Sequence, residues 1–213
     1  GLLATLGFQV GSKKLYAIEG SVFVTGATVQ WLRDGLGIIS NAEETSDMAM
    51  LAGSNAGVYF VPAFVGLGAP HWQPYATASI TGMTRGTSQH HIVRAALEST
   101  AYQVKDVVGA MEGGRTRSNQ PFRADGGQSN NPFVMQFQAD ILDRPVEVAG
   151  VAETTALGAA FLAGRGVGLW RSENEISSLW QASARYEPSI SESERTSLYA
   201  GWLDAIRRSS TTN

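Results

Sequence analysis

The feature that most constrains this chain is the alternation of short apolar segments with longer amphipathic ones. Short segments that are rich in β-branched and aromatic residues and bounded by glycine favour strands. The strand candidates are residues 2–10, 15–18, 58–63, 79–81, 122–124 and 146–148. The first two predict a hairpin, and the others alternate with helical patterns. This order predicts an α/β domain whose mixed sheet has helices on both faces.

Five helices are predicted from residues that suit a helix start and from apolar residues that return to one face every turn. Their expected starts are Thr25, His91, Pro132, Thr154 or Thr155, and Ser191. The first helix is expected to end near Leu36, because Gly37 follows it as a stop signal. The second is expected to run to Met111 and has the strongest apolar periodicity.

Composition excludes several classes of function. The 213 residues suit one large domain or two small ones and can bury a sizeable core. A net charge of −3 argues against a nucleic-acid binder, which needs a basic patch. It argues equally against binding to a membrane surface. Without cysteine, disulfides and thiolate metal sites are excluded. No segment approaches the roughly 18 apolar residues of a membrane helix, and no signal peptide is recognisable, so we expect a cytoplasmic protein.

A glycine pair lies between a predicted strand and a predicted helix. Gly126 and Gly127 follow the strand that ends at Ala124, and Pro132 begins the next helix after Asn131. Paired glycines let a ligand approach the backbone closely, and a helix start offers free N–H groups to an anion such as a nucleotide phosphate. The same residues also form ordinary turns and helix caps, which is the commoner explanation of such a pattern. The pattern matches neither a Walker loop nor a dinucleotide fingerprint.

A second candidate pair is Gly26 and Gln30, four residues apart on one predicted helix. This spacing places both residues on the same face, where a ligand against the glycine could also reach the amide. An amide both donates and accepts hydrogen bonds, which suits a ribose or a base edge. Alternatively, Gly26 only relieves crowding and Gln30 faces water.

The histidines and carboxylates give no recognisable metal site or acid–base pair. His90 and His91 are expected at a helix entrance, whereas His71 lies in the glycine- and proline-rich segment 65–77 and has the better claim to function. Segments of that length without regular structure are often functional.

Three arginines lie near the glycine pair. Arg115, Arg117 and Arg123 could bind an anion, although a solvated loop is the commoner explanation of such a cluster.

Five segments, taken in order, resemble the carboxyl-terminal half of the FGGY family of carbohydrate kinases. They are residues 20–34, 61–70, 78–98, 125–142 and 155–160. The run from Pro62 to Pro70 resembles members that act on glycerol, since sugar-specific relatives usually differ there. The resemblance extends over nearly all of residues 1–213. It implies one carboxyl-terminal nucleotide-binding domain with the actin-like, ribonuclease H-like ATPase fold, one of two domains that close around ATP and a polyol.

The resemblance also implies a reaction, in which ATP with Mg²⁺ phosphorylates glycerol to glycerol 3-phosphate. Carried over by position, the implied nucleotide contacts are Gly26, Gln30, Gly127 and Asn131. In this family the catalytic aspartate and most glycerol contacts belong to the amino-terminal domain or to the stretch just upstream of Gly1. No catalytic residue or metal ligand is therefore assigned here, and we expect a fragment that is inactive alone. Family members often self-associate, which allows a homo-oligomer.

Two alternatives remain open at this point. The chain departs from the wording common in glycerol-specific members at His71, Gln73 and Thr77, where tyrosine, aspartate and arginine are usual. The substrate could therefore be another polyol or a sugar. A non-catalytic actin-like module that binds nucleotide or a partner is the second alternative.

Overall fold

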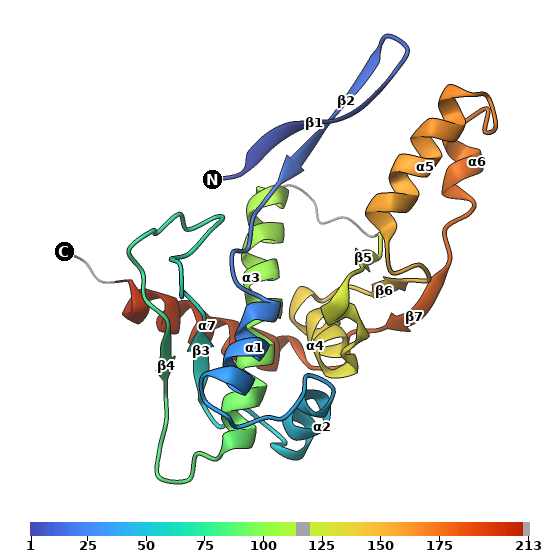
Figure 1. The fold of residues 1–213 in the computed structure, drawn as a ribbon. Coiled ribbons are helices and arrows are strands. Elements are labelled where there is room, and N and C mark those ends of the chain that lie inside the picture. The colour runs from blue at the N-terminus through green and yellow to red at the C-terminus, as the bar shows by residue number, and fades with distance from the viewer. Residues whose placement is uncertain (114–119, 211–213) are drawn as a thin grey trace.

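The computed structural model describes residues 1–113 and 120–210, and in this part of the chain an initial hairpin is followed by strands and helices in mixed order (Figure 1). The strands are β1 (Leu3–Val10), β2 (Lys13–Glu19), β3 (Tyr59–Val61), β4 (Ser79–Thr81), β5 (Phe122–Ala124), β6 (Val146–Ala149) and β7 (Ala182–Tyr186). The helices are α1 (Gly26–Asp34), α2 (Glu44–Leu51), α3 (Gln89–Glu112), α4 (Pro132–Leu142), α5 (Thr154–Gly166), α6 (Glu173–Ser177) and α7 (Glu192–Ser209), with a 3₁₀ turn, η1 (Gly127–Asn130). The α/β class expected from the sequence is confirmed.

The mixed sheet consists of three strands, with β5 parallel to β6 and β7 antiparallel to β6. Within the described residues, β1 with β2 and β3 with β4 form two separate antiparallel pairs. Helix α4 packs on the face of the mixed sheet that carries Val146 and Val148. Side chains alternate along a strand, so Arg123 and Glu147 belong to the other face. There α5 and α6 line a second cavity of about 310 Å³ together with Arg123.

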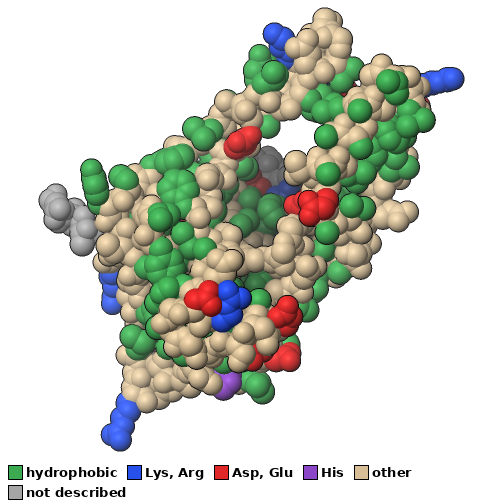
Figure 2. Space-filling model, viewed as in Figure 1, with side chains coloured by type: hydrophobic (Ala, Val, Ile, Leu, Met, Phe, Trp, Pro, Cys, Tyr) green, Lys and Arg blue, Asp and Glu red, His purple; other side chains and the backbone are tan. Residues whose placement is uncertain are grey.

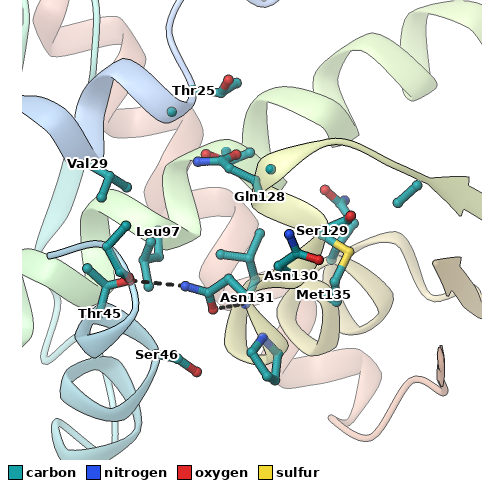
Figure 3. Close-up of a pocket in the computed structure, with 18 of the residues that line it drawn as sticks. Thr25, Val29, Thr45, Ser46, Leu97, Gln128, Ser129, Asn130, Asn131 and Met135 are labelled. Carbon is teal, nitrogen blue, oxygen red and sulfur yellow. Dashed lines mark hydrogen bonds between the residues drawn. The ribbon is translucent and has the colours of Figure 1, made fainter. Parts of the chain in front are cut away.

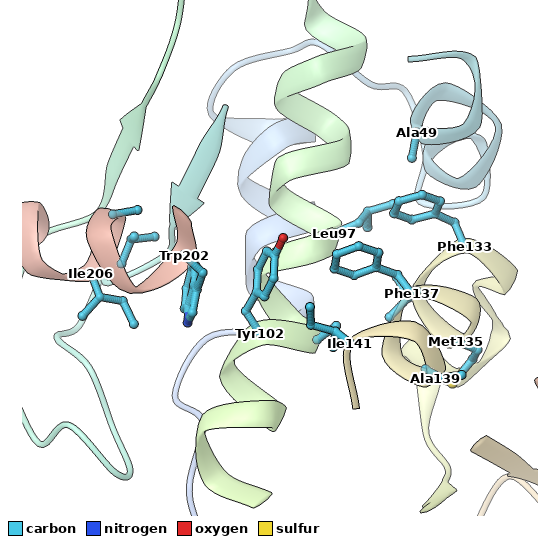
Figure 4. Packing of buried hydrophobic residues seen from close by; sticks show 14 of the residues in the cluster. Ala49, Leu97, Tyr102, Phe133, Met135, Phe137, Ala139, Ile141, Trp202 and Ile206 are labelled. Atoms are coloured by element: carbon cyan, nitrogen blue, oxygen red, sulfur yellow. The ribbon is translucent and has the colours of Figure 1, made fainter. Parts of the chain in front are cut away.

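Helix α3 runs through the centre of the molecule and carries the main core (Figure 4). Tyr102 of α3 stacks on Trp202 of α7, with ring centroids 5.2 Å apart. Phe137 of α4 meets the edge of the same tyrosine at 5.3 Å. Burial of large aromatic rings dominates core energetics, so these contacts fix α4 and α7 against α3.

The predicted helix starts have the expected chemistry at two places. The Asn131 side chain accepts a hydrogen bond from the Val134 amide at 3.2 Å, and Pro132 is the first residue of α4. Ser191 likewise caps α7 by accepting from the Glu194 amide at 3.2 Å. Thr25 precedes α1 but makes no side-chain cap bond. Asn131 and Ser191 therefore define the first residues of α4 and α7. The start of each helix fixes which face its later side chains occupy.

The segment 65–77 is anchored by a buried carboxylate on α3. Asp106 lies 3.0 Å from His71 Nε2 and accepts hydrogen bonds from Tyr199 Oη at 2.5 Å and Trp202 Nε1 at 2.9 Å. Its side chain is only 2% exposed. His71 therefore ties the segment to α3 and α7 through Asp106.

The β1–β2 hairpin projects from the body, and Figure 2 shows an opening between it and α5. Large apolar side chains on the hairpin remain exposed, namely Leu3, Leu6, Tyr16 and Ile18.

None of the described helices is both long enough and apolar enough to cross a membrane.

Candidate functional site

A cavity of about 900 Å³ lies between α1, the start of α2, the middle of α3 and the β5–α4 connection (Figure 3). Its floor is one face of α3, which contributes Leu97, Thr100 and Val104. These positions are three and four residues apart, so they fall on a single side of the helix. The cavity is large enough for a drug-sized or nucleotide-sized ligand.

The cavity brings together the four residues that the sequence predicted as nucleotide contacts. They are Gly26 and Gln30 from α1, Gly127 from η1, and Asn131 at the cap of α4. The structure thus places the two candidate pairs on opposite walls of one site. Their role as nucleotide contacts stays a prediction.

Both glycines present bare backbone to open space. A Cβ atom built on Gly26 or on Gly127 would meet no other heavy atom within 4 Å. Neither glycine is therefore needed to relieve crowding inside the protein. This observation removes the packing explanation that the sequence left open for Gly26 and leaves room for a ligand against both backbones.

The Asn131 side chain is held at both ends. Its Oδ1 accepts from the Val134 amide, and its Nδ2 donates to Thr45 Oγ1 at 3.1 Å. Thr45 in turn donates to the Ala42 carbonyl at 2.6 Å, so the direction of its hydroxyl is fixed. Figure 3 shows the hydrogen bond between Thr45 and Asn131, which links α2 to α4 across the cavity. The amide keeps one N–H and one lone pair for a ligand.

Helix α2 supplies site residues that the sequence analysis missed, namely Thr45 and Ser46. Both are buried, and polar residues on the inner face obscure the apolar periodicity that marks a helix. The start of α2 did carry a signal. The Glu44 amide donates to Asn41 Oδ1 at 3.0 Å, and Glu44 Oε1 accepts from the Asn41 amide at 3.2 Å. Such a reciprocal Asn-x-x-Glu pair matches the capping-box pattern, which predicts a helix start within two residues of the observed N-cap, Glu43.

The glycine turn shapes the other end of the cavity. Gly126 has a φ of 85°, which favours glycine, and its carbonyl accepts from Ser129 Oγ at 2.7 Å. The turn leads from the carboxyl end of β5 into the amino terminus of α4, where backbone N–H groups and the helix dipole favour an anion.

Charged side chains of both signs line the mouth: Arg33, Glu43, Arg123 and Asp125. Arg33 pairs with Asp34 at 2.7 Å, which lowers the pKa of the Asp34 carboxyl. Arg123 lies over the Trp180 ring at 4.2 Å, and Asp125 accepts a hydrogen bond from Thr154. Arg115 and Arg117 lie outside the described residues.

A buried acid lies behind the floor. Glu98 of α3 is fully buried, and burial raises its pKa to about 7 against the opposing effect of Arg94. Arg94 Nε donates to Glu98 Oε1 at 2.7 Å, and Asn55 Nδ2 donates to Glu98 Oε2 at 3.1 Å.

Within the described ranges, no group of three or more histidine and acidic side chains could hold a metal ion. His91 Nδ1 accepts from the Ser88 amide at 3.0 Å at the start of α3, which confirms its expected place at a helix entrance. None of the three histidines lines the large cavity.

The match to a family model and the likeness to a solved structure define a carbohydrate-kinase domain with the actin-like, ribonuclease H-like ATPase fold. Residues 1–167 match the C-terminal domain of the FGGY family of carbohydrate kinases, and the chain belongs to that family. The remaining described residues continue the same structure, because β7 pairs with β6 and Trp202 of α7 enters the core.

Known relatives cover this chain almost completely. Glycerol kinase 2 of Thermotoga maritima is 57% identical over 209 residues, which are 98% of this chain and 42% of that protein. The crystal structure of Plasmodium falciparum glycerol kinase with ADP has a TM-score of 0.90 at 36% identity, covering 100% of this chain and 43% of that one. A ligand-bound xylulose kinase from Lactobacillus acidophilus has a TM-score of 0.76 at 25% identity, covering 91% and 39%. The chain therefore spans less than half the length of these relatives.

Proposed function

We propose that this chain is the nucleotide-binding domain of an ATP-dependent glycerol kinase, with residues 1–213 forming that one domain. The observation that carries the proposal is the convergence of Gly26, Gln30, Gly127 and Asn131 on one cavity. The likeness to a glycerol kinase with ADP supports a nucleotide as the ligand. In the complete protein, the γ-phosphoryl group of ATP passes to glycerol and gives glycerol 3-phosphate.

The two ends of the cavity suit the two ends of a nucleotide. Thr45 and Leu97 at one end are buried, and a neutral base suits such an environment better than a phosphate does. Gly127 at the other end is exposed, so phosphates beside it can stay hydrated. We therefore place the base against Asn131 and the phosphates toward the glycine turn.

A magnesium ion fits this arrangement as part of the substrate. Mg²⁺ usually keeps several waters and is held by one or two carboxylates together with substrate phosphates. Asp125 is the carboxylate nearest in sequence to the glycine turn and lines the cavity there. It would approach the metal directly or through water, while the phosphates supply the other ligands. The bound ion neutralises charge on the transferring group.

The remaining machinery is proposed to come from the rest of the kinase. Phosphoryl transfer depends on positioning and on charge neutralisation from both sides of the transferring group. This chain spans 42% of its Thermotoga maritima relative, and the roles proposed for its described residues include nucleotide contacts but no base for the acceptor hydroxyl. We therefore propose that the chain alone does not phosphorylate glycerol.

A kinase for another polyol or a sugar is the second candidate, because a xylulose kinase shares the fold. The higher identity and TM-score of the glycerol kinase structure favour glycerol. The complete protein that contains this chain tests the choice, because most acceptor contacts are expected outside these residues. A higher kcat/KM with glycerol than with xylulose supports the proposal. A folded complete protein that binds Mg·ADP but prefers xylulose over glycerol contradicts the substrate assignment.

A further inference from the structure

Arg94 of α3 contacts both α2 and α4, which supply two walls of the cavity. Its Nη1 donates to the Ala49 carbonyl of α2 at 3.2 Å, and its guanidinium lies over the Phe133 ring of α4, 5.0 Å from the centroid. Figure 4 shows Ala49 and Phe133 facing each other beside α3. The arginine side chain is 17% exposed, so most of it is enclosed by these partners.

The same two walls carry the bridge that holds Asn131. Thr45 is one turn before Ala49 on α2, so both lie on the same face of that helix. Asn131 is two residues before Phe133 and caps α4. Any change in the distance between Ala49 and Phe133 therefore changes the distance between Thr45 Oγ1 and Asn131 Nδ2, now 3.1 Å.

Arg94 is itself fixed by Glu98, which is 1% exposed and accepts from Arg94 Nε at 2.7 Å. The second Glu98 oxygen accepts from Asn55, so the carboxylate cannot turn away. A planar guanidinium in a bidentate or stacked position is a rigid spacer that lysine does not reproduce.

We propose that Arg94, locked by Glu98, is a positioning residue for nucleotide binding: it sets the separation of α2 and α4 and thereby the orientation of the Asn131 amide. This inference rests on the proposed nucleotide site. Arg94 itself does not line the cavity and acts only through Thr45 and Asn131.

The ionisation state of Glu98 should then affect the affinity for nucleotide. The groups that face Glu98 are Arg94 and Tyr102 of α3, Tyr59 of β3, and Asn55 before β3. From α2 and α4 the Ala49 carbonyl and the Phe133 ring contact the cluster, and neither carries a charge. Protonated Glu98 would hold Arg94 less firmly, because a neutral carboxyl is a weaker acceptor than a carboxylate. Nucleotide should therefore bind more tightly above neutral pH than below it.

The decisive experiment uses the double variant Arg94→Met/Glu98→Gln. Replacing both members of a buried ion pair is often neutral for stability, so this variant should fold. Mg·ADP affinity is measured by calorimetry, and the Asn131 side-chain amide is followed by NMR without nucleotide. We expect affinity to fall about tenfold, the effect of one misplaced hydrogen bond, together with a shifted Asn131 amide resonance.

The matched control is Arg195→Met. Arg195 also bonds a carbonyl of α4, that of Asp140 at 2.7 Å, and pairs with Asp143, but at the far end of the helix from Asn131. This variant should lose stability and keep the parent affinity. A third variant, Glu98→Gln alone, should remove the part of the pH profile of affinity that the parent shows around neutral pH.

The outcomes separate the two proposals. Unchanged Mg·ADP affinity and an unshifted Asn131 amide in the folded double variant overturn the role of Arg94 while leaving the nucleotide site intact. Identical pH profiles for the parent and Glu98→Gln also count against it. Failure of the parent to bind Mg·ADP overturns the proposed nucleotide site and the inference that rests on it.

Discussion

Asn131 Nδ2 donates to Thr45 Oγ1 at 3.1 Å, so the cap of α4 is also the link between two walls of the large cavity. The two residues are 86 positions apart in the sequence. The residue that caps α4 is thereby also a fixed part of the cavity wall.

Substitution of Asn131 should therefore affect both stability and binding. Asn131→Ala removes the cap and the link to α2, and we expect a loss of about 1 kcal/mol in unfolding free energy. Gln30→Ala should leave stability unchanged, because that side chain is exposed. Both changes should weaken Mg·ADP binding. Urea unfolding gives the first quantity and calorimetry the second. Equal stability of Asn131→Ala and the parent would refute the capping role.

The two cavity glycines should tolerate a methyl group without nucleotide. Because a Cβ at Gly26 or Gly127 meets nothing within 4 Å, alanine there should keep or slightly raise the melting temperature. In Mg·ADP titrations the same methyl groups occupy space reserved for the ligand and should weaken affinity. Gly109→Ala is the matched control, since Gly109 on α3 is equally open but does not line the cavity. Unaltered affinity in both cavity variants would mean that the ligand does not lie against them.

Glu98 should make stability depend on pH. Its pKa is raised from 4.5 to about 7 in the folded protein. The folded state thus holds this proton more tightly than the unfolded state does, so its contribution is full below about pH 4.5 and is lost as pH rises through 7. The loss amounts to about 3 kcal/mol. Unfolding free energies from pH 4 to 8 should lose this slope in Glu98→Gln, and retention of the slope would contradict the assignment.

The Asp106 cluster should be among the most sensitive positions. Asp106→Leu leaves the Trp202 N–H and the Tyr199 hydroxyl without their acceptor, and we expect a loss of about 3–5 kcal/mol. Tyr199→Phe removes one hydrogen bond and should cost only about 1 kcal/mol. Denaturant unfolding measures both. A loss for Asp106→Leu as small as that for Tyr199→Phe would show that the carboxylate is not the centre of the cluster.

Local patterns in the sequence predicted much of the fold and some of the residues that line the cavity. Gly26 and Gln30 share a face because helical spacing alone dictates it, and Pro132 located the start of α4 and its cap at Asn131. Strands β4 and β5 have the predicted bounds. These features depend on interactions within a few residues, which periodicity and capping chemistry describe.

Other features depend on contacts between distant segments. Thr45 faces Asn131 only after α2 has packed on α4, and nothing in either local pattern encodes that pairing. Helix α2 itself escaped prediction because its inner face mixes hydroxyls with Ala49. The family resemblance implied that both glycine motifs contact one nucleotide. The structure places both motifs on one cavity.

Calorimetric titration of this chain with Mg·ADP, with Gln30→Ala and Asn131→Ala alongside and folding checked by circular dichroism, tests the central claim most directly. We predict saturable binding by the parent chain that both substitutions weaken, because the two amides lie on opposite walls of the cavity. Absence of binding by the folded parent, or binding that neither substitution changes, would contradict a nucleotide site between α1 and the glycine turn.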